Sequence, residues 1–406
     1  MTKLKMGYVP KTVYSVLNPI FYSSKIIGLT PFSLNSTRYK NSKLNKIWCC
    51  ILLIVYVTIF SCFKEQLHVS AGFITALTAK VDSYCNQFGM WFAIIFAMRF
   101  ANDLIGAITD LNKLDGELHK TFKVNIKEEH CKSFKNFVIV LVVVLVYSIF
   151  YSVNAVFMTT VLDTRSPRVI VDYIIYVGPT LTKTVITLQF SSITWCLKRR
   201  FILLNKAIEN RFNKFNAFTS TIISDAKIVP SDVMQDKVIN VFEDVREKHI
   251  QLCMICVKIN SCYSFQILML VLQNFITIIL AMYFGGRNLF GHDVISVGFL
   301  IYCFNQMFSA IVQIVALVLI CSSTVMEARR TGDLIHNSLT FLEPCKKEMY
   351  LQASYFSLQL LHNNFDFTAS GVLTIDPSLL LEIVGAICTY LVIVVQFEIS
   401  YPTPNC

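Results

Sequence analysis

The chain has 406 residues, of which 54% are hydrophobic, 13% aromatic and only 15% charged. A soluble protein of this length would carry nearer ~25% charged residues, so the composition excludes a soluble globular domain. Fourteen glycines and ten prolines are too few for a linker-rich or disordered chain. An integral membrane protein is therefore the starting class. The 14 cysteines lie scattered through apolar runs and are interpreted as small buried hydrophobes.

Long uncharged stretches mark the candidate membrane spans, since a helix needs about 20 mostly apolar residues to cross a bilayer. The second candidate is bounded by Asp82 and Arg99, and the fourth is interrupted by Lys183. The seven predicted spans cover residues 47–63, 83–98, 136–162, 173–197, 259–286, 294–326 and 377–397. We therefore predict an all-α, multi-pass plasma-membrane protein.

The distribution of basic residues orients these spans, because short cytoplasmic loops carry an excess of lysine and arginine. Eight basic residues and no acidic residue precede the first span. Of the 36 basic residues, 30 fall on the same side as this N-terminal segment and five on the opposite side. The N-terminus is therefore expected in the cytoplasm and the C-terminus outside, the reverse of a G-protein-coupled receptor. This asymmetry accounts for the net charge of +10, so no nucleic-acid partner is expected.

The connections assigned to the cytoplasm are long and helical in pattern. Apolar positions recur at helical spacing through residues 198–258, so spans four and five are expected to continue into the cytoplasm, with a break near residues 220–230. Span six is expected to continue past Glu327, Pro344 to start a further helix, and Asp376-Pro377 to open the last span. The expected parts are an N-terminal segment (1–46), spans one to six with their extensions (47–322), cytoplasmic anchor helices (323–376) and the last span with an external tail (377–406).

The outer halves of spans two to six combine aromatic side chains with amides and hydroxyls. Small-molecule pockets are mostly apolar and aromatic with a few polar groups, so this inventory predicts a ligand site. The candidates are Gln87, Trp91, Tyr147, Tyr151, Asn154, Tyr173, Tyr176, Thr180, Tyr283, Tyr302, Asn305 and Gln306. For any single tyrosine the alternative is an anchor at the membrane interface. Lys183, with no obvious acidic partner in another span, either faces a hydrated ligand cavity or is satisfied within the helix bundle.

Catalytic and metal-binding patterns are missing from the sequence. Glycine-rich phosphate loops, His-Glu-x-x-His and Gly-x-Ser-x-Gly are absent, so an enzyme is not expected. His249, Cys253 and Cys256 share a helical face, but a metal site would need a fourth ligand and usually a loop. An apolar helix face is the preferred interpretation, and no cofactor or metal is expected.

The last span ends in amide, aromatic and acidic residues. Fifteen uncharged residues from Ile383 to Phe397 are followed by Glu398. Where several such helices pack around an axis, Gln396 and Phe397 would form a narrow ring, and Glu398 would form an acidic collar that favours cations.

The same stretch reads Thr389-Tyr390-Leu391-Val392-Ile393-Val394-Val395-Gln396-Phe397. It matches the TYhhhhhQF signature of insect gustatory receptors at every position, with five apolar residues in the gap. The chain also resembles that family in its length, its seven spans and its cytoplasmic N-terminus.

This resemblance implies a homotetrameric, tastant-gated, non-selective cation channel related to insect odorant receptors. In such a channel the seventh spans line a central pore, with Gln396 and Phe397 at the gate. The predicted pore residues are Thr389, Tyr390, Gln396, Phe397 and Glu398, and each subunit has a pocket open to the outside. Cytoplasmic helix extensions would form the anchor between subunits. Sugar-sensing members carry an acidic residue after the Thr-Tyr pair. Leu391 stands there instead, which favours a receptor for a bitter or plant-derived molecule or a fructose-like sugar.

The partners implied are the tastant, membrane lipid, permeant cations and further copies of the chain, with co-assembly with other gustatory receptor chains left open. Two other functions also stay open. One is a seven-span receptor that signals through cytoplasmic proteins. The other is a multi-span carrier or enzyme, against which stand the missing catalytic motifs, the lack of inverted repeats and the lack of the broken helices of transporters.

Overall fold

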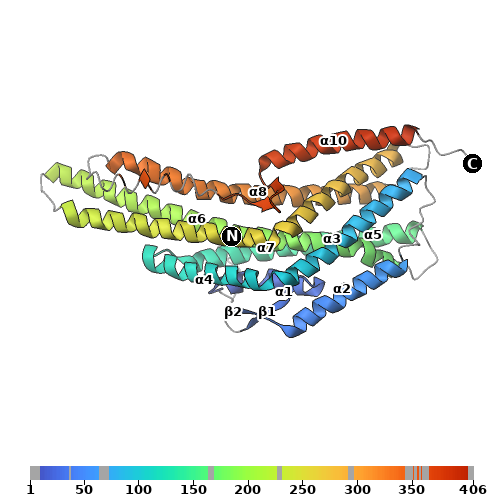
Figure 1. The fold of residues 1–406 in the computed structure, drawn as a ribbon, viewed down its shortest axis with the longest axis horizontal. Coiled ribbons are helices and arrows are strands. Elements are labelled where there is room, and N and C mark those ends of the chain that lie inside the picture. Colours follow the sequence, from blue (N-terminus) through green and yellow to red (C-terminus); the bar gives the residue numbers. More distant parts are fainter. Residues whose placement is uncertain are drawn as a thin grey trace, which may run out of the picture.

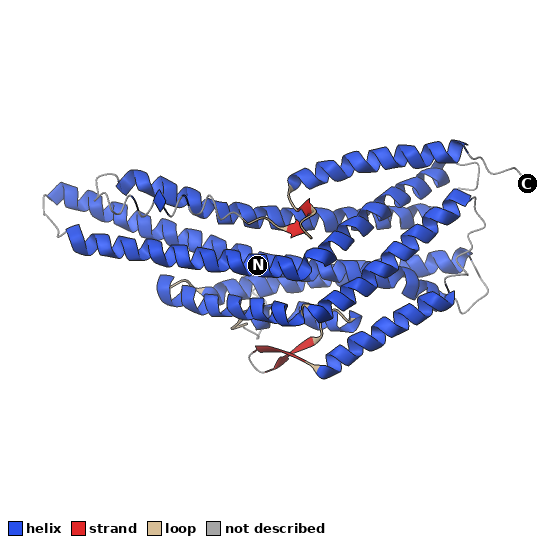
Figure 2. Ribbon diagram, viewed as in Figure 1, coloured by secondary structure: helices blue, strands red, loops and turns tan. Residues whose placement is uncertain are grey.

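The computed structural model describes residues 10–35, 38–63, 73–162, 169–225, 231–290, 297–342 and 365–400, with positions 351, 354, 355 and 358 between the last two segments. Within this part of the chain the fold is helical apart from two short hairpins, as Figure 2 shows. The expected all-α class is confirmed. Most helices run roughly along one long axis of the molecule (Figure 1).

A helix is present at each of the seven predicted spans. These helices are α2 (Lys43–Phe63), α3 (Phe73–Arg99), α5 (Ile126–Leu162), α6 (Val169–Asp225), α7 (Ser231–Phe290), α8 (Val297–Leu342) and α10 (Pro377–Ser400). By the length and composition of their described residues, five of them could cross a membrane, namely α2, α5, α7, α8 and α10. A sixth candidate is α3 taken together with α4 (Ala101–Phe122), which follows it after a 60° bend. The count of seven spans also requires α6 and stays a prediction.

The polarity of α6 follows from its place inside the bundle. Every residue from Val177 to Asn205 is buried or partly buried. Apolar Phe190 and polar Thr194 are both completely enclosed. A helix that faces protein on all sides can carry hydroxyl and charged groups that a lipid-facing helix cannot. Hydropathy therefore underestimates the capacity of α6 to lie within a membrane.

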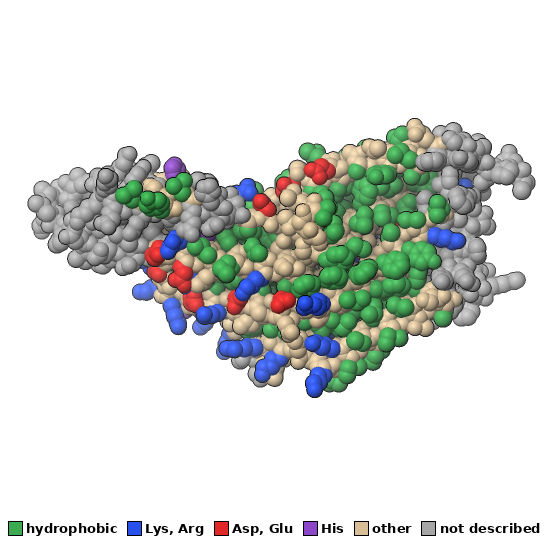
Figure 3. All heavy atoms as spheres, viewed as in Figure 1, with side chains coloured by type: hydrophobic (Ala, Val, Ile, Leu, Met, Phe, Trp, Pro, Cys, Tyr) green, Lys and Arg blue, Asp and Glu red, His purple; other side chains and the backbone are tan. Residues whose placement is uncertain are grey.

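An apolar belt surrounds one half of the molecule. Aliphatic side chains are exposed along α2, α5 and α10, among them Ile54, Ile139, Val143 and Leu381. Figure 3 shows hydrophobic side chains gathered over that half, with lysine, arginine and acidic side chains beyond its edge. Such a surface is suited to hydrocarbon and would drive aggregation in water. We assign the apolar belt to the membrane and call the remaining part of the molecule the base.

The base is formed largely by long helices that continue out of the belt. Figure 1 shows α6, α7 and α8 running on together beyond the other helices. α6 ends at Asp225 and α7 begins at Ser231, on either side of the break predicted near residues 220–230. α8 runs past Glu327 to Leu342, as predicted. The helix predicted from Pro344 lies largely outside the described residues. The predicted boundary between residues 322 and 323 falls inside α8, so that division stays a prediction.

Two segments that were interpreted as connections contain helices instead. The N-terminal segment folds into α1 (Val13–Ile27) and a hairpin of β1 (Phe32–Asn35) and β2 (Arg38–Asn41). Thr12 and Ser15 form reciprocal capping bonds at the start of α1, and Gly28 ends it at a φ of 85°, which glycine adopts without strain. Residues 99–135 contain α4. Both helices are amphipathic rather than apolar throughout, so a search for apolar runs did not detect them.

The last helix begins at Pro377, as predicted. The Asp376 carboxylate accepts hydrogen bonds from the backbone N–H groups of Ser378 (2.9 Å) and Leu379 (3.3 Å). The hydrogen bond from the Ser378 hydroxyl, together with these backbone bonds, holds the pKa of Asp376 below its usual range. A second hairpin of β3 (Thr368–Ala369) and β4 (Leu373–Thr374) precedes the helix and packs against α7.

Candidate functional site

Four of the predicted ligand-site residues meet where α5, α6 and α8 come together. The rings of Tyr151 and Tyr302 stack with their centroids 6.4 Å apart. The Gln306 amide donates to the hydroxyl of Tyr151 and, at 2.8 Å, to that of Tyr302. Thr180 Oγ1 lies 3.5 Å from the Tyr151 hydroxyl, at the limit of a hydrogen bond. We call these four residues the tyrosine cluster.

Lys183 lies one turn along α6 from the tyrosine cluster and is only 4% exposed. Its ammonium donates to Thr277 Oγ1 on α7 over 3.5 Å. No obvious acidic partner for Lys183 was expected in another span, and a nearby acidic side chain on α3 was missed. The Asp82 carboxylate on α3, which accepts a hydrogen bond from Asn86 Nδ2 at 2.9 Å, interacts electrostatically with Lys183. Asp82 was missed because it was interpreted as the boundary of span two.

A buried amide network joins α6, α7 and α8 near Lys183. The Gln313 amide nitrogen donates to the hydroxyls of Thr184 and Ser309, at 3.1 Å each, and its carbonyl oxygen accepts from Asn274 Nδ2 at 3.2 Å. Polar side chains inside a bilayer are expensive and mark functional candidates. These residues were not predicted. The sequence feature that could have identified them is the spacing of Gln306, Ser309 and Gln313, which places all three on one face of span six.

Several buried polar atoms in the membrane half have no hydrogen-bond partner among the described residues. Among them are Trp91 Nε1, Asn274 Oδ1, the Tyr283 hydroxyl and Asn305 Nδ2. Leaving such an atom unpaired costs about 1–3 kcal/mol, so a purely structural core would pair it. Of these, Asn305 adjoins Gln306 and Asn274 bonds Gln313, so an unpaired donor and an unpaired acceptor lie in the region of the tyrosine cluster for a ligand to use.

The predicted residues of α3 pack apart from the tyrosine cluster. Gln87 is buried on α3. The Trp91 ring packs edge to face against Phe60 of α2 and Phe88 of its own helix, at centroid distances of 5.7 and 5.1 Å. Apart from the unpaired Trp91 nitrogen, these contacts are those of an aromatic core.

Of the remaining predicted ligand-site residues, some lie beside the tyrosine cluster and others do not. The backbone carbonyl of Asn305 accepts from the Tyr147 hydroxyl at 3.1 Å, which ties α8 to α5 beside the tyrosine cluster. Asn154 Nδ2 donates to the carbonyl of Phe150 in its own helix at 3.3 Å, so its interpretation as a pocket residue gains no support from this contact. The side chains of Tyr173 and Tyr176 lie outside the described residues.

The predicted pore helix α10 lies at the edge of the bundle, against α7 and α8 (Figure 1). The Tyr390 ring meets Phe275 of α7 edge to face, with centroids 5.8 Å apart. Thr389 Oγ1 donates to the Gly385 carbonyl one turn earlier in the helix, at 3.0 Å. One side of α10 is therefore fixed to the bundle.

The opposite side of α10 is open in the single chain. Leu381, Val384 and Val392 are exposed along it, and so is Gln396 near its end. The side chains of Phe397 and Glu398 lie outside the described residues. The assignment of Thr389, Tyr390, Gln396, Phe397 and Glu398 to the pore and its gate stays a prediction.

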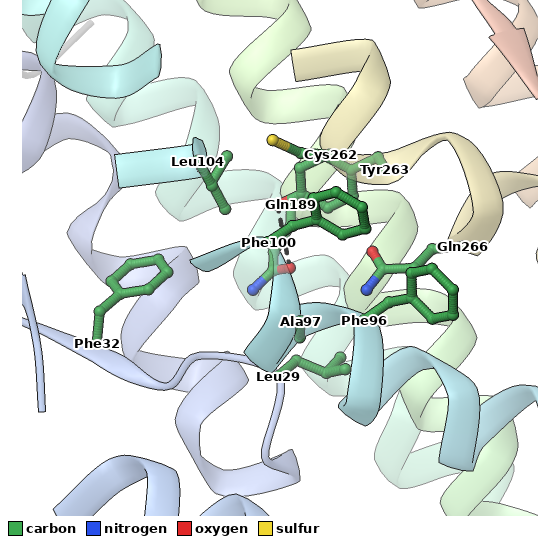
Figure 4. Close-up of a pocket in the computed structure, with 10 residues that line it drawn as sticks. All are labelled: Leu29, Phe32, Phe96, Ala97, Phe100, Leu104, Gln189, Cys262, Tyr263 and Gln266. Atoms are coloured by element: carbon green, nitrogen blue, oxygen red, sulfur yellow. Dashed lines mark hydrogen bonds between the residues drawn. The ribbon is translucent and has the colours of Figure 1, made fainter. Parts of the chain in front are cut away.

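A small cavity lies where α3 bends into α4, on the side of the N-terminal segment (Figure 4). Its lining residues are Leu29, Phe32, Phe96, Ala97, Phe100, Leu104, Gln189, Cys262, Tyr263 and Gln266. The cavity volume is about 10 Å³, room for one water molecule. The Gln189 and Gln266 amides already donate to Thr30 Oγ1 and the Ala93 carbonyl, at 3.1 and 3.0 Å. This cavity is too small for a tastant.

A buried ion cluster in the base was not predicted. Arg200 of α6 donates to both carboxylate oxygens of Asp115 on α4, at 2.9 and 2.8 Å. His130 Nε2 of α5 lies 2.8 Å from Asp115 Oδ2, and all three side chains are buried. The cluster joins three helices and contains no group placed for catalysis on a substrate. It could not be seen in the sequence because its members are 15 and 70 positions apart.

His249, Cys253 and Cys256, which share one face of α7, pack between helices. Cys253 Sγ lies 3.7 Å from His249 Nδ1, and His249 Nε2 lies 3.1 Å from the Ala328 carbonyl of α8. Cys256 is buried. Where side chains are described, no group of three or more histidine, cysteine, aspartate or glutamate residues is arranged to hold a metal ion.

Fold and site together define an all-α, multi-pass membrane protein built around a buried polar cluster. Residues 17–401 match the family model described as 7tm Chemosensory receptor, and the chain therefore belongs to this family of insect receptors. Gustatory receptor 28b of Drosophila melanogaster is 22% identical over 97% of this chain and 87% of its own length. Gustatory receptor 2a of the same organism is 26% identical over 59% of each chain.

Solved structures share the fold. The insect olfactory receptor OR5 from Machilis hrabei has a TM-score of 0.69 at 13% identity, over 94% of this chain and 97% of that receptor. The same receptor in complex with eugenol has a TM-score of 0.64 at 14% identity, with the same coverage. The chain is thus a chemosensory receptor of the gustatory type with an olfactory-receptor-like fold.

Proposed function

We propose that the protein is a tastant-gated, non-selective cation channel of the plasma membrane, assembled as a homotetramer around α10. The observation that carries this proposal is the packing of α10. The helix is fixed to α7 and α8 by one side, exposes an apolar opposite side and ends in the gustatory receptor signature. A free apolar side within the membrane faces lipid or other copies of the chain, and the signature favours other copies.

The tastant is proposed to bind at the tyrosine cluster. Stacked tyrosine rings supply apolar contact area, while Gln306 and the neighbouring Lys183 and Asp82 supply donors and acceptors. The related olfactory receptor that was solved in complex with eugenol supports binding of a small molecule by this fold. Leu391 in place of an acidic residue supports a bitter or plant-derived molecule or a fructose-like sugar as the tastant.

The binding region is proposed to act on the pore through α7. Asn274 of this helix belongs to the amide network, and the adjacent Phe275 contacts Tyr390 of α10. Moving a channel from 1:99 to 99:1 open requires about 5.5 kcal/mol of differential binding energy. Four pockets sharing that load would each supply about 1.4 kcal/mol, or a tenfold difference in affinity between closed and open states.

The proposed gate can be tested by truncating its side chains. Gln396→Ala and Phe397→Ala are each expected to change the basal current or the ion selectivity in voltage-clamped cells, while surface expression persists. Ile139→Ala is a matched control, because it truncates an exposed side chain of the apolar belt on α5. The control is expected to conduct as the unmodified protein does. Unchanged currents from both α10 variants would remove the pore assignment.

A further inference from the structure

The N-terminal segment carries basic side chains that no described acidic side chain neutralises. They are Lys25 on α1, Arg38 and Lys40 on β2, and Lys43 and Lys46 at the start of α2. Some basic residues elsewhere in the base differ, since Arg199, Lys248 and Lys258 pair with acidic groups at 2.5–2.7 Å. The first 46 residues contain no acidic residue at all. We call these five residues the N-terminal basic patch.

Exposed apolar side chains lie beside the N-terminal basic patch. Tyr22 and Ile26 on α1 are 67% and 69% exposed, and Leu44, Ile47 and Trp48 on α2 are 79%, 55% and 46% exposed. The exposed apolar surface continues along α2 into the apolar belt. Aromatic and basic residues gathered at such an edge are typical of the interface between membrane and water. The patch therefore lies at the rim of the membrane-embedded surface.

Direct contacts hold α1 and α2 together as one surface. Trp48 Nε1 donates to the Lys25 carbonyl at 3.1 Å. A Cβ atom added to Gly28 would lie 3.1 Å from Leu52 Cδ1, which shows how closely the end of α1 approaches α2. The exposed side chains of the two helices are thus fixed next to one another rather than on independent segments.

Two charges of the patch oppose the stability of the helix that carries them. Lys43 and Lys46 occupy the first turn of α2, where positive charge opposes the helix dipole. The Lys25 ammonium lies 5.9 Å from the centre of the Tyr22 ring, and its partial burial lowers its pKa. An anion placed over the patch would compensate these positive charges.

We infer that the N-terminal basic patch binds the phosphate-bearing headgroup of an anionic phospholipid, with the acyl chains against Leu44, Ile47 and the outer face of α2. The charges attract the headgroup, and the adjoining apolar surface accepts the chains. An acidic protein partner would match the charge but not a surface that continues into the membrane. Since basic residues favour the cytoplasmic side, the lipid belongs to the inner leaflet.

The test measures lipid binding by the full-length protein purified in a neutral detergent. The probe is dioctanoyl phosphatidylserine, whose dissociation constant is determined by microscale thermophoresis. The triple variant Lys25→Gln/Lys40→Gln/Lys43→Gln is expected to bind at least tenfold more weakly, since each basic residue near an anionic surface contributes about a fivefold factor. The matched control Lys120→Gln/Lys123→Gln/Lys127→Gln removes the same charge from exposed positions on α4, at its end and on α5, and is expected to bind as the unmodified protein does.

Two further probes define the ligand. Dioctanoyl phosphatidylcholine has no net charge and glycerophosphoserine has no acyl chains, and both are expected to bind at least tenfold more weakly than the anionic lipid. Equal affinity of the patch variant and the unmodified protein would overturn the inference. So would glycerophosphoserine binding as tightly as the lipid, which would indicate a site for free phosphate compounds. If the triple variant does not fold, Lys25→Gln and Lys43→Gln tested singly should each weaken binding about fivefold.

Discussion

The buried ion cluster of the base and the tyrosine cluster of the membrane half are both polar and buried, yet they are bonded differently. Arg200, Asp115 and His130 meet through three contacts of 2.8–2.9 Å. In the tyrosine cluster the Gln306 amide bonds to the two tyrosine hydroxyls are equally short, but the Tyr151–Thr180 contact and the nearby Lys183–Thr277 contact both reach 3.5 Å. Apart from His130 Nδ1, the polar atoms of the ion cluster itself are paired, whereas several around the tyrosine cluster are not.

This difference indicates what each region does. Short, bidentate and charge-assisted bonds fix three helices of the base against one another. Long or missing bonds leave the membrane half with polar groups that can exchange their present contacts for those of a ligand. The base therefore acts as the scaffold, and the tyrosine cluster with its surroundings is the region suited to recognition.

The largest effect is expected from breaking the buried ion cluster. Arg200→Met leaves the Asp115 carboxylate buried without its cation, which should destabilise the protein by about 3–5 kcal/mol. The measurement is the midpoint of thermal denaturation of the detergent-solubilised protein, together with its yield. Adding Asp115→Asn to Arg200→Met should restore part of the loss. Lys132→Met is the control, since Lys132 is 59% exposed in its pair with Glu128, and an Arg200→Met midpoint no lower than this control would contradict the scaffold role.

A medium effect is expected where α3 crosses α7. A Cβ atom at Gly89 would lie 1.7 Å from Gln273 Nε2, which donates to the carbonyls of Cys85 and Asn86 at 2.9 and 3.2 Å. Gly89→Ala must displace that amide and should cost about 1–3 kcal/mol. Adding Gln273→Ala removes the collision, so the two substitutions should be strongly non-additive in thermal denaturation.

Gly106→Ala is the matched control for Gly89→Ala. Gly106 also lies within a helix, and a Cβ atom there meets nothing within 4 Å. It should leave stability unchanged or raise it by up to about 1 kcal/mol, because alanine favours a helix over glycine. Equal effects at the two glycines would show that the close approach of α3 and α7 is not as described.

The smallest effect on stability, but a clear effect on function, is expected at Gln306. Gln306→Ala removes the donor shared by Tyr151 and Tyr302, which should cost about 1 kcal/mol of stability. The half-maximal agonist concentration should rise about tenfold, given ~1.4 kcal/mol of lost interaction. The readout is calcium imaging of cells that express this chain alone, with an agonist found by screening fructose, plant alkaloids and glycosides.

Asn154→Ala is the control for the agonist response. Asn154 was predicted in the same inventory, but its amide bonds to its own helix. Its truncation should shift the half-maximal concentration by less than threefold, on the order of 0.6 kcal/mol. A larger shift for Asn154→Ala than for Gln306→Ala would place recognition outside the tyrosine cluster.

The sequence allowed the lipid-facing helices to be predicted well, because exposure to hydrocarbon requires uncharged side chains over a full span. α2, α5 and α10 follow that rule. α1 and α4 were missed because their polar faces interrupt any apolar run. A helix was predicted correctly at α6. Its described residues are too polar to meet the length and hydropathy requirement for a membrane span, because protein rather than lipid surrounds the helix.

The site was predicted in part for a similar reason. Tyr151, Tyr302 and Gln306 were found because aromatic and amide residues are conspicuous in an apolar span. The electrostatic interaction of Lys183 with Asp82 depends on how α3 packs beside α6, which no pattern along the chain encodes. Gln313 lies just beyond the outer half of its span, and Asn274 lies at the inner edge of the outer half of its own span, where it was passed over.

The most direct test of the proposed channel is to record currents from the purified protein alone in planar lipid bilayers. The account predicts single-channel cation currents that appear on addition of the agonist and change in conductance or selectivity in Gln396→Ala. A protein that binds the agonist but passes current only when cytoplasmic proteins are added would contradict it, and would favour a receptor that signals through partners.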